Sequence, residues 1–190
     1  MNSDARDWLS AGGAALALVA PAPVVVAAEY LSLEAAQRAV FPEGRGFEPV
    51  TLQLSPAQRQ QLAAMAGAQP PRGQVRAWRV LGVTAPLGFF FTDEVVGRQD
   101  FIDYALGINT DGTLRSPEIM SYRESHGGEI RNTAWRRQFS GRSDGTALRP
   151  VVDIRNIAGA TLSCEHVTAG VRYLSALWQL VLRPAAAASP

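Results

Sequence analysis

The stretch DIRNIAGATLSCEHVTAG, Asp153 to Gly170, decides how this chain folds. A short apolar segment leads into the small-residue turn Gly159-Ala160-Thr161, and the longest helical pattern of the chain follows it. The start of a helix offers free backbone N–H groups and a positive dipole end, and small side chains let a bulky group approach. These features suit a phosphate ester at Thr161. An ordinary strand-to-helix turn with Thr161 as the N-cap explains the same residues and is the simpler interpretation on the residues alone.

The segments on either side of this turn predict a strand and a core helix. Val151 to Ile154 form a short apolar run that is typical of a strand. After Thr161, apolar residues recur at intervals near 3.6, which indicates a helix packed against a sheet. The residues of this stripe are Val167, Val171, Leu174, Trp178 and Val181.

Strand patterns dominate the middle of the chain. Residues 74–81 alternate, and residues 87–97 are almost continuously apolar, which predicts a central strand with Phe89, Phe90 and Phe91 in the core. Residues 100–122 read as an antiparallel hairpin, because a strictly alternating run enters turn residues at Asn109 to Gly112. Pro117 is expected near an edge or a bulge.

Helices are expected before these strands. Ser32 is a cap for a first helix that Pro42 stops, and Ser55-Pro56 is a cap followed by a first-turn proline for a second helix that ends at Gly67. Both look like packing elements without chemistry of their own.

A second informative stretch is the polar loop Glu124 to Glu129 after the hairpin. It contains Glu124, Ser125, His126, Gly127 and Gly128. Paired glycines let backbone amides approach something flat or charged, which favours a binding loop. The alternative is a polar turn before a helix capped by Asn132, with Trp135 and Phe139 on its inner side.

The two ends of the chain differ from its middle. Residues 1–28 read as a secretory signal peptide cleaved near Ala28, with an uncleaved anchor or a mis-assigned start codon as alternatives. Two prolines and a short apolar stretch argue against a transmembrane helix. We expect residues 29–183 to form one domain, and the aperiodic tail 184–190 to be disordered.

Composition excludes several classes of function. The net charge is +1, which gives no reason to expect nucleic acid as a partner, and the 18 basic residues are all arginines. A zinc site is not expected, because His126 and His166 lie far apart in the sequence and no cysteine pair accompanies them. A Cys164–His hydrolase is a weak hypothesis, because Cys164 and His166 do not share a helix face. Serine-hydrolase and Rossmann or P-loop fingerprints are absent.

The run Gly159-Ala160-Thr161-Leu162-Ser163 resembles the SGAT-type flavinylation motif of FMN-binding domains, the family that includes flavin subunits of Rnf and Na⁺-translocating NADH:quinone reductase complexes. In that family a Mg²⁺-dependent flavin transferase joins FMN through a phosphoester to the threonine that Thr161 matches. The loop from Glu124 takes the place of the family's ETPGLG loop beside the isoalloxazine ring, and Glu124 and Gly127 match it. The order of elements extends the resemblance over about residues 75–180.

Two positions depart from the family pattern. Ala158 stands where the family has Ser or Thr, and Arg155 stands where it has Asp, with Asp153 and Asn156 nearby. Arg155 could approach the phosphate, and Asn156 could supply a hydrogen bond.

The resemblance implies an α+β fold with a twisted, mostly antiparallel sheet of roughly five strands flanked by helices. It implies an exported, periplasmic FMN-carrying electron-transfer protein, either free or membrane-anchored through its N-terminus, rather than a stand-alone enzyme. A flavin transferase and a redox partner, membrane-bound or soluble, would be its partners. The alternative is a non-redox binding module of the same fold that holds FMN without a covalent bond or binds a protein.

Overall fold

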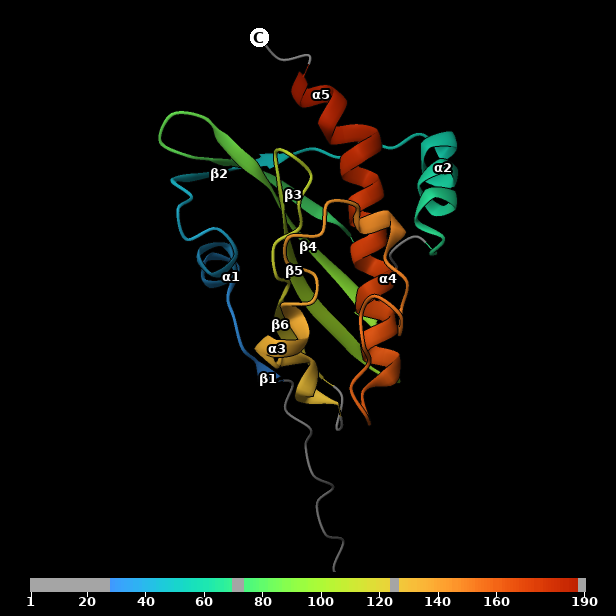
Figure 1. Ribbon diagram of the computed structural model, residues 1–190. Coiled ribbons are helices and arrows are strands. Elements are labelled where there is room, and N and C mark those ends of the chain that lie inside the picture. The colour runs from blue at the N-terminus through green and yellow to red at the C-terminus, as the bar shows by residue number, and fades with distance from the viewer. Residues whose placement is uncertain (1–27, 70–73, 124–126, 188–190) are drawn as a thin grey trace, which may run out of the picture.

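One antiparallel sheet forms the centre of the molecule (Figure 1). The structure is a computed structural model and describes residues 28–69, 74–123 and 127–187. The strand order is β1-β6-β5-β4-β3-β2, and every neighbouring pair is antiparallel. The strands are β1 (Ala28–Glu29), β2 (Gly46–Val50), β3 (Arg76–Leu81), β4 (Pro86–Val96), β5 (Phe101–Asn109) and β6 (Glu118–Tyr122). Five longer strands and one two-residue edge strand confirm the α+β fold expected from the sequence.

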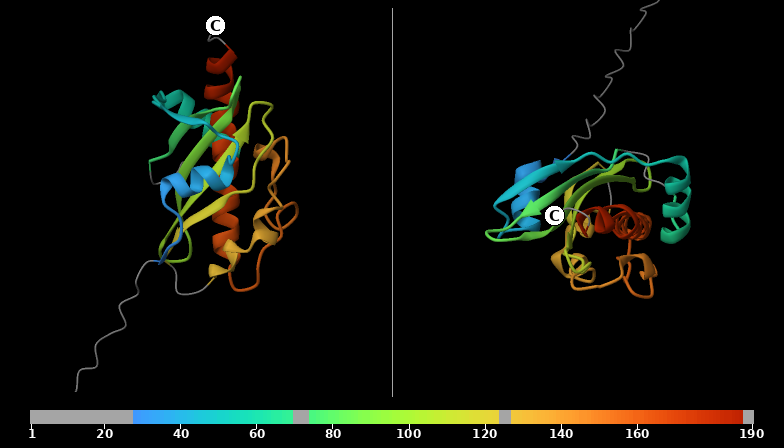
Figure 2. Two further views of the ribbon diagram at one scale, coloured as in Figure 1. Left: turned by 90° about the vertical axis from the view of Figure 1, so that its left-hand side faces the viewer. Right: turned by 90° about the horizontal axis from the view of Figure 1, so that it is seen from above.

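Helices cover both faces of this sheet (Figure 2). The long helix α4 (Thr161–Leu177) crosses one face, and α2 (Pro56–Ala66) packs beside it. The short helix α1 (Leu33–Val40) covers part of the other face. The larger apolar core lies under α4, and a smaller one lies under α1. The remaining helical turns are η1 (Gly128–Arg131), α3 (Thr133–Arg136), η2 (Gly145–Ala147), η3 (Trp178–Leu182) and α5 (Arg183–Ala187).

Strand β4 contributes to both cores because its side chains alternate between the two faces. Phe89 and Phe91 belong to the core under α4, whereas Phe90 belongs to the core under α1. Each of the three rings is at most 5 % exposed. The prediction of a central strand buried on both faces is confirmed, and burial of each ring contributes roughly 1.5–3 kcal/mol.

The first two helices begin where the sequence predicts. Ser32 accepts a hydrogen bond from the Ala35 amide, and α1 ends one residue before Phe41. Ser55 and Gln58 form a reciprocal capping box at the start of α2, and Gly67 ends it in the left-handed conformation. Such caps supply partners for amides that a helix cannot satisfy itself.

Helix α4 approaches the sheet closely at one glycine. A Cβ atom on Gly170 would lie 2.3 Å from the hydroxyl of Tyr104 on β5. The predicted apolar stripe faces the core, with Val167, Val171 and Leu174 fully buried. The helical path continues through η3 and α5 to Ala187, into the tail that we expected to be disordered. Residues 188–190 lie outside the described residues.

One expected strand is corrected, and one strand is found that was not expected. Val151 to Ile154 form a turn, because Asp153 folds back to accept hydrogen bonds from the amide and the guanidinium of Arg149. Val151 has a φ of 69°, and Val151 and Val152 are 58 % and 63 % exposed. Only Ile154 enters the core. The strand β2 was not predicted, because Pro49 and Glu48 interrupt its alternating pattern.

No helix among the described residues is long and apolar enough to cross a membrane.

Candidate functional site

Helix α4 starts at Thr161 and lacks a side-chain cap. Ala160 is the N-cap, and its carbonyl accepts the Cys164 amide at 2.9 Å. The amides of Thr161, Leu162 and Ser163 therefore have no acceptor within the helix. Thr161 is exposed and is the first helical residue, so the interpretation of Thr161 as the N-cap is wrong. Its hydroxyl lies at the positive end of the helix dipole.

The turn before Thr161 leaves room for a ligand. Gly159 has a φ of 85°, and a Cβ atom there would meet nothing within 4 Å. The Ala160 amide donates to the Ile157 carbonyl at 3.0 Å, which closes the turn. The Ile157 amide in turn approaches the sulfur of Cys164 at 3.5 Å. Hydrogen bonds on the inner side of the turn thus hold its backbone, and its outer side at Gly159 has free space around it.

The predicted glycine loop reaches this turn. Gly127 has a φ of 88°, and a Cβ atom there would lie 2.6 Å from the Tyr122 hydroxyl and 3.2 Å from the Cβ of Ala160. Below this contact the hydroxyls of Tyr122 and Ser163 are 3.2 Å apart, which joins the end of β6 to the first turn of α4. A Cβ atom on Gly128 would meet nothing within 4 Å. Glu124, Ser125 and His126 lie outside the described residues.

The two positions that depart from the flavinylation motif have different surroundings. The backbone of Arg155 is held by Trp135 and Gln138, whose side chains contact its carbonyl and its amide at 2.9 and 2.8 Å. The Arg155 side chain is exposed. Asn156 donates to Glu165 on α4 at 3.1 Å, and its buried Oδ1 has no partner within the described part of the chain. Ala158 is exposed.

A hollow of about 440 Å³ lies beside the first turns of α4. We call it the α4–β4 hollow; it is lined by Ala68 and Gln69 after α2, residues 93–98 from the end of β4, and Leu162, His166, Ala169 and Gly170 on α4. Leu162 is 44 % exposed at its rim. Nδ1 of His166 contacts the carbonyl oxygens of Val96 and Gly97, so this nitrogen carries the proton and donates.

Asp93 is the buried carboxylate of this hollow. It is 4 % exposed, and the Tyr104 hydroxyl donates to its Oδ2 at 2.8 Å. Its Oδ1 is buried without a partner among the described residues. Burial raises the pKa of Asp93 to about 6, although the hydrogen bond from Tyr104 acts in the opposite direction. Burial, helped by Asp93, also raises the pKa of Tyr104 well above its usual value.

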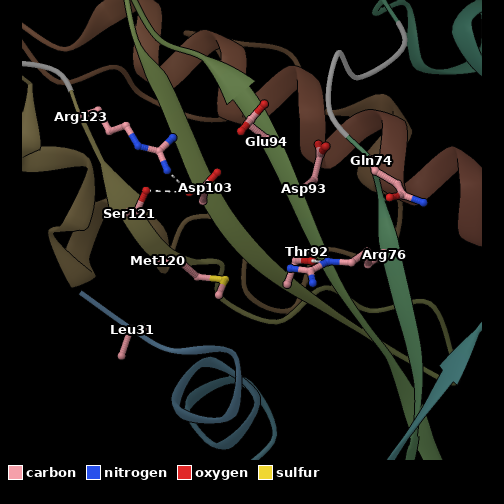
Figure 3. Close-up of a pocket in the computed structure, with 10 residues that line it drawn as sticks. All are labelled: Leu31, Gln74, Arg76, Thr92, Asp93, Glu94, Asp103, Met120, Ser121 and Arg123. Carbon is pink, nitrogen blue, oxygen red and sulfur yellow. Dashed lines mark hydrogen bonds and ion pairs between the residues drawn. The ribbon is translucent and has the colours of Figure 1, made fainter. Parts of the chain in front are cut away.

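A second hollow, of about 520 Å³, opens on the sheet face that α1 leaves uncovered (Figure 3). Asp103 accepts hydrogen bonds there from Ser121 at 2.6 Å and from the Arg123 guanidinium at 3.2 Å. Burial, and then the neighbouring Asp103 charge, raise the pKa of Glu94. Arg76 donates to Thr92 at 3.3 Å. This second hollow is polar, and several of its groups satisfy one another.

The other proposed chemistries find no support in the described residues. No cluster of three potential metal ligands occurs among them. Cys164 is fully buried, and burial raises the pKa of its thiol, which disfavours a thiolate nucleophile.

One comparison with known families finds a match that includes the turn before α4. Residues 97–175 match the model of the FMN-binding domain. This segment is an FMN-binding domain. It contains β5, β6, the glycine loop and nearly all of α4, and it supports FMN as the cofactor of this chain. The match is narrower than the resemblance over residues 75–180. Comparison with curated proteins finds no match.

The sequence predicted the two segments of this site, the turn before α4 and the glycine loop, but not the contacts between them. It singled out Gly159 to Ser163 and Gly127 to Gly128, and the structure brings Gly127 against Ala160. It did not foresee the Tyr122–Ser163 contact or the burial of Asp93. A carboxylate inside the apolar run FFFTDEVV was the available signal for Asp93.

Proposed function

We propose that this FMN-binding domain is an electron carrier whose FMN is attached through its phosphate to Thr161. The observation that carries the proposal is an exposed threonine hydroxyl at the first residue of the uncapped helix α4. Attachment forms a bond between the threonine oxygen and phosphorus. With a flavin dinucleotide as the donor, its pyrophosphate P–O bond breaks, the nucleoside monophosphate leaves and the hydroxyl proton is released, so the chain gains the mass of FMN minus water. A flavin transferase would install the group.

The residues around Thr161 fit a phosphoester. The free amides of the first helical turn donate to phosphate oxygens, and the helix dipole contributes about 0.3–1 kcal/mol toward the negative charge. Gly159 and Gly128 leave the approach open, since side chains at these positions would meet nothing. The exposed guanidinium of Arg155 offers a further positive charge near the turn.

When bound, FMN supplies reversible uptake and release of electrons. The chain's own part is to fix the phosphate and to position the ring. Gly127 packed on Ala160, and Tyr122 in contact with Ser163, hold the glycine loop against the attachment turn. A rigid attachment keeps the distance to a redox partner constant.

Co-expression with a flavin transferase tests the attachment. Intact mass should increase by FMN minus water, and the purified protein should be yellow after denaturing gel filtration. Thr161→Ala should lose the increment. Thr133→Ala is the matched control, because Thr133 is the exposed first residue of α3. A wild-type protein without the increment would refute covalent attachment.

Export to the periplasm is part of the same proposal. It rests on the apolar N-terminal run ending near Ala28, which precedes the described residues except for Ala28 itself. The redox partner would then be a periplasmic or membrane-bound protein. A fusion of residues 1–35 to a reporter that is active only outside the cytoplasm should be active, and a cytoplasmic reporter signal would contradict export.

A further inference from the structure

Positive charge gathers on one segment of the chain, residues 131–155. This segment contains six arginines and two aspartates, whereas the whole chain has a net charge of +1. We propose that it is the docking surface for a protein with an acidic face, the redox partner of the flavin. The inference rests on the proposed function for the electrons that are exchanged, but the surface itself consists of residues of the chain alone.

The segment forms an outer layer that ends at the attachment turn. Figure 2 shows it, in gold and orange, on the side of α4 that faces away from the sheet. The layer is closed on itself, because the Gln138 side chain accepts from the Arg155 amide at 2.8 Å and donates to the Arg155 carbonyl at 3.3 Å. The next residue, Asn156, donates to Glu165 on α4. A protein docked on this layer therefore lies beside a group attached to Thr161.

The positive charge of this surface is only partly neutralised. Four exposed guanidinium groups of the segment form no ion pair with a carboxylate in the described part of the chain; they are those of Arg131, Arg137, Arg142 and Arg155. The Arg142 guanidinium donates instead to the carbonyl oxygens of Gln138 and Asp153, at 3.1 and 3.2 Å. The Asp153 carboxylate already pairs with Arg149. Such an excess of one charge attracts a surface of the opposite sign and speeds its encounter.

An exposed apolar turn adjoins these arginines. Val151 and Val152 are mostly exposed, and the Arg149–Asp153 interaction closes the turn that carries them. The φ of Val151, 69°, is a conformation that a β-branched residue rarely adopts. Protein interfaces combine arginines with apolar side chains that the partner covers. The two valines therefore give the charged surface an apolar contact point.

The composition of the segment favours a protein over an anionic membrane as the partner. Lipid headgroups also attract arginines, but segments that lie in a membrane surface insert Trp, Phe or Leu side chains. Here Trp135, Phe139 and Leu148 are buried in the core. The large apolar side chains that the segment exposes are the two valines of the turn.

The probe is succinylated cytochrome c, a haem protein whose lysines have been made acidic. Native cytochrome c has the same haem and a basic surface, so it is the matched control. Isothermal titration calorimetry at low ionic strength measures the binding of each form to the full chain without flavin. The acidic form should bind at least about tenfold more tightly than the basic form, and 0.15 M salt should remove most of this difference.

Charge reversal locates the binding surface. Arg137→Glu combined with Arg142→Glu should weaken binding of the acidic form by at least about tenfold. Arg38→Glu combined with Arg45→Glu makes the same change in net charge at exposed positions in α1 and before β2, and it should stay within about threefold. Arg137→Glu alone should weaken binding by about threefold, and it leaves the hydrogen bonds of Arg142 in place.

The flavinylated protein tests whether docking serves electron transfer. Each ferric haem takes up one electron, so two cytochromes oxidise one reduced flavin and its protons pass to the solvent. In stopped-flow mixing, the Arg137→Glu/Arg142→Glu variant should reduce the acidic cytochrome at least about tenfold more slowly than the wild type. Its mass increment should be unchanged. A loss of the increment in this variant would assign the surface to the flavin transferase and overturn the assignment to the redox partner.

The remaining outcomes separate this inference from the proposed function. Equal affinities for the two cytochromes, or equal losses in the two double variants, would overturn the docking surface and leave the attachment at Thr161 intact. Binding to phosphatidylglycerol vesicles that requires Arg137 and Arg142, without binding to the acidic cytochrome, would overturn it in favour of a membrane. Arginine-dependent binding of the acidic cytochrome by a chain that never gains the flavin mass would support the docking surface and refute the attachment.

Discussion

Replacing Gly127 by alanine tests the contact that joins the glycine loop to the attachment turn. The alanine would adopt a φ of 88°, which costs roughly 1–2 kcal/mol for a residue with a Cβ atom. Its Cβ would also lie 2.6 Å from the Tyr122 hydroxyl, so the ring must shift and weaken the contact with Ser163, worth about 1 kcal/mol. Together these effects predict a loss of about 2–3 kcal/mol in the free energy of unfolding.

Two neighbouring glycines provide the controls. Gly159→Ala carries the strain of a positive φ without any close contact, so it should cost about 1–2 kcal/mol. Gly128→Ala carries neither and should change stability by less than about 0.5 kcal/mol. Urea unfolding gives the three free energies, and the melting temperature of Gly127→Ala should fall by about 5–10 °C.

The order of the three variants is the decisive result. If Gly127→Ala is no more destabilising than Gly159→Ala, the loop does not pack against Ala160, and Gly127 does not join the two parts of the site. The flavinylated fraction should follow the same order when the variants are co-expressed with the transferase, because a displaced loop also displaces the turn that carries Thr161.

Three further outcomes are expected. Because the pKa of Asp93 is raised from 3.8 to about 6, its contribution to stability is fully present below pH 3.8 and is lost as the pH rises toward 6. Urea unfolding should show that the free energy of unfolding falls by up to about 3 kcal/mol over this range. The Asp93→Asn variant should not show this fall. Gly170→Ala should destabilise by about 2–4 kcal/mol, and it should cost less in a Tyr104→Phe background, which lacks the hydroxyl 2.3 Å from the added Cβ; thermal denaturation of the four proteins of this double-mutant cycle separates that difference from the loss of the Tyr104–Asp93 hydrogen bond. Ser55→Ala should cost about 1 kcal/mol in urea unfolding through the lost capping box at α2, whereas Ser143→Ala in an exposed loop should cost almost nothing.

Local patterns in the sequence predicted most elements because their causes are local. The cap residues Ser32 and Ser55 fixed helix starts, and the alternation in β5 fixed a strand. Val151 and Val152 misled because β-branched residues favour strands, whereas here the Arg149–Asp153 interaction closes a turn around them. That interaction also lowers the pKa of Asp153 to about 2. The residues from Val151 to Ile154 do not themselves indicate that Arg149 will donate hydrogen bonds to Asp153 and close a turn.

The site was predictable only in pieces, because its parts meet through the tertiary fold. Gly127 and Ala160 are separated by more than thirty residues, and they meet because β6 ends beside the first turn of α4, where Tyr122 contacts Ser163. Asp93 comes from a third segment of the chain, β4. It lies just beyond the last residue pair between β3 and β4, which is Arg76 with Thr92. Among the described residues, the last four residues of β4 therefore pair with β5 alone, and the hollow lies beside this stretch.

The departures from the flavinylation motif are easier to judge from the structure than from the motif. Ala158 is exposed on the outer side of the turn, and the Arg155 backbone is fixed by Trp135 and Gln138 rather than by its own side chain. The turn therefore keeps its shape without the hydroxyl and the carboxylate that the motif has there. The turn is held by the contacts of Trp135 and Gln138 with the Arg155 backbone and by the Asn156–Glu165 hydrogen bond. Arg155→Asp should accordingly leave the turn and the stability unchanged within about 0.5 kcal/mol, and any effect on FMN attachment should come from charge alone.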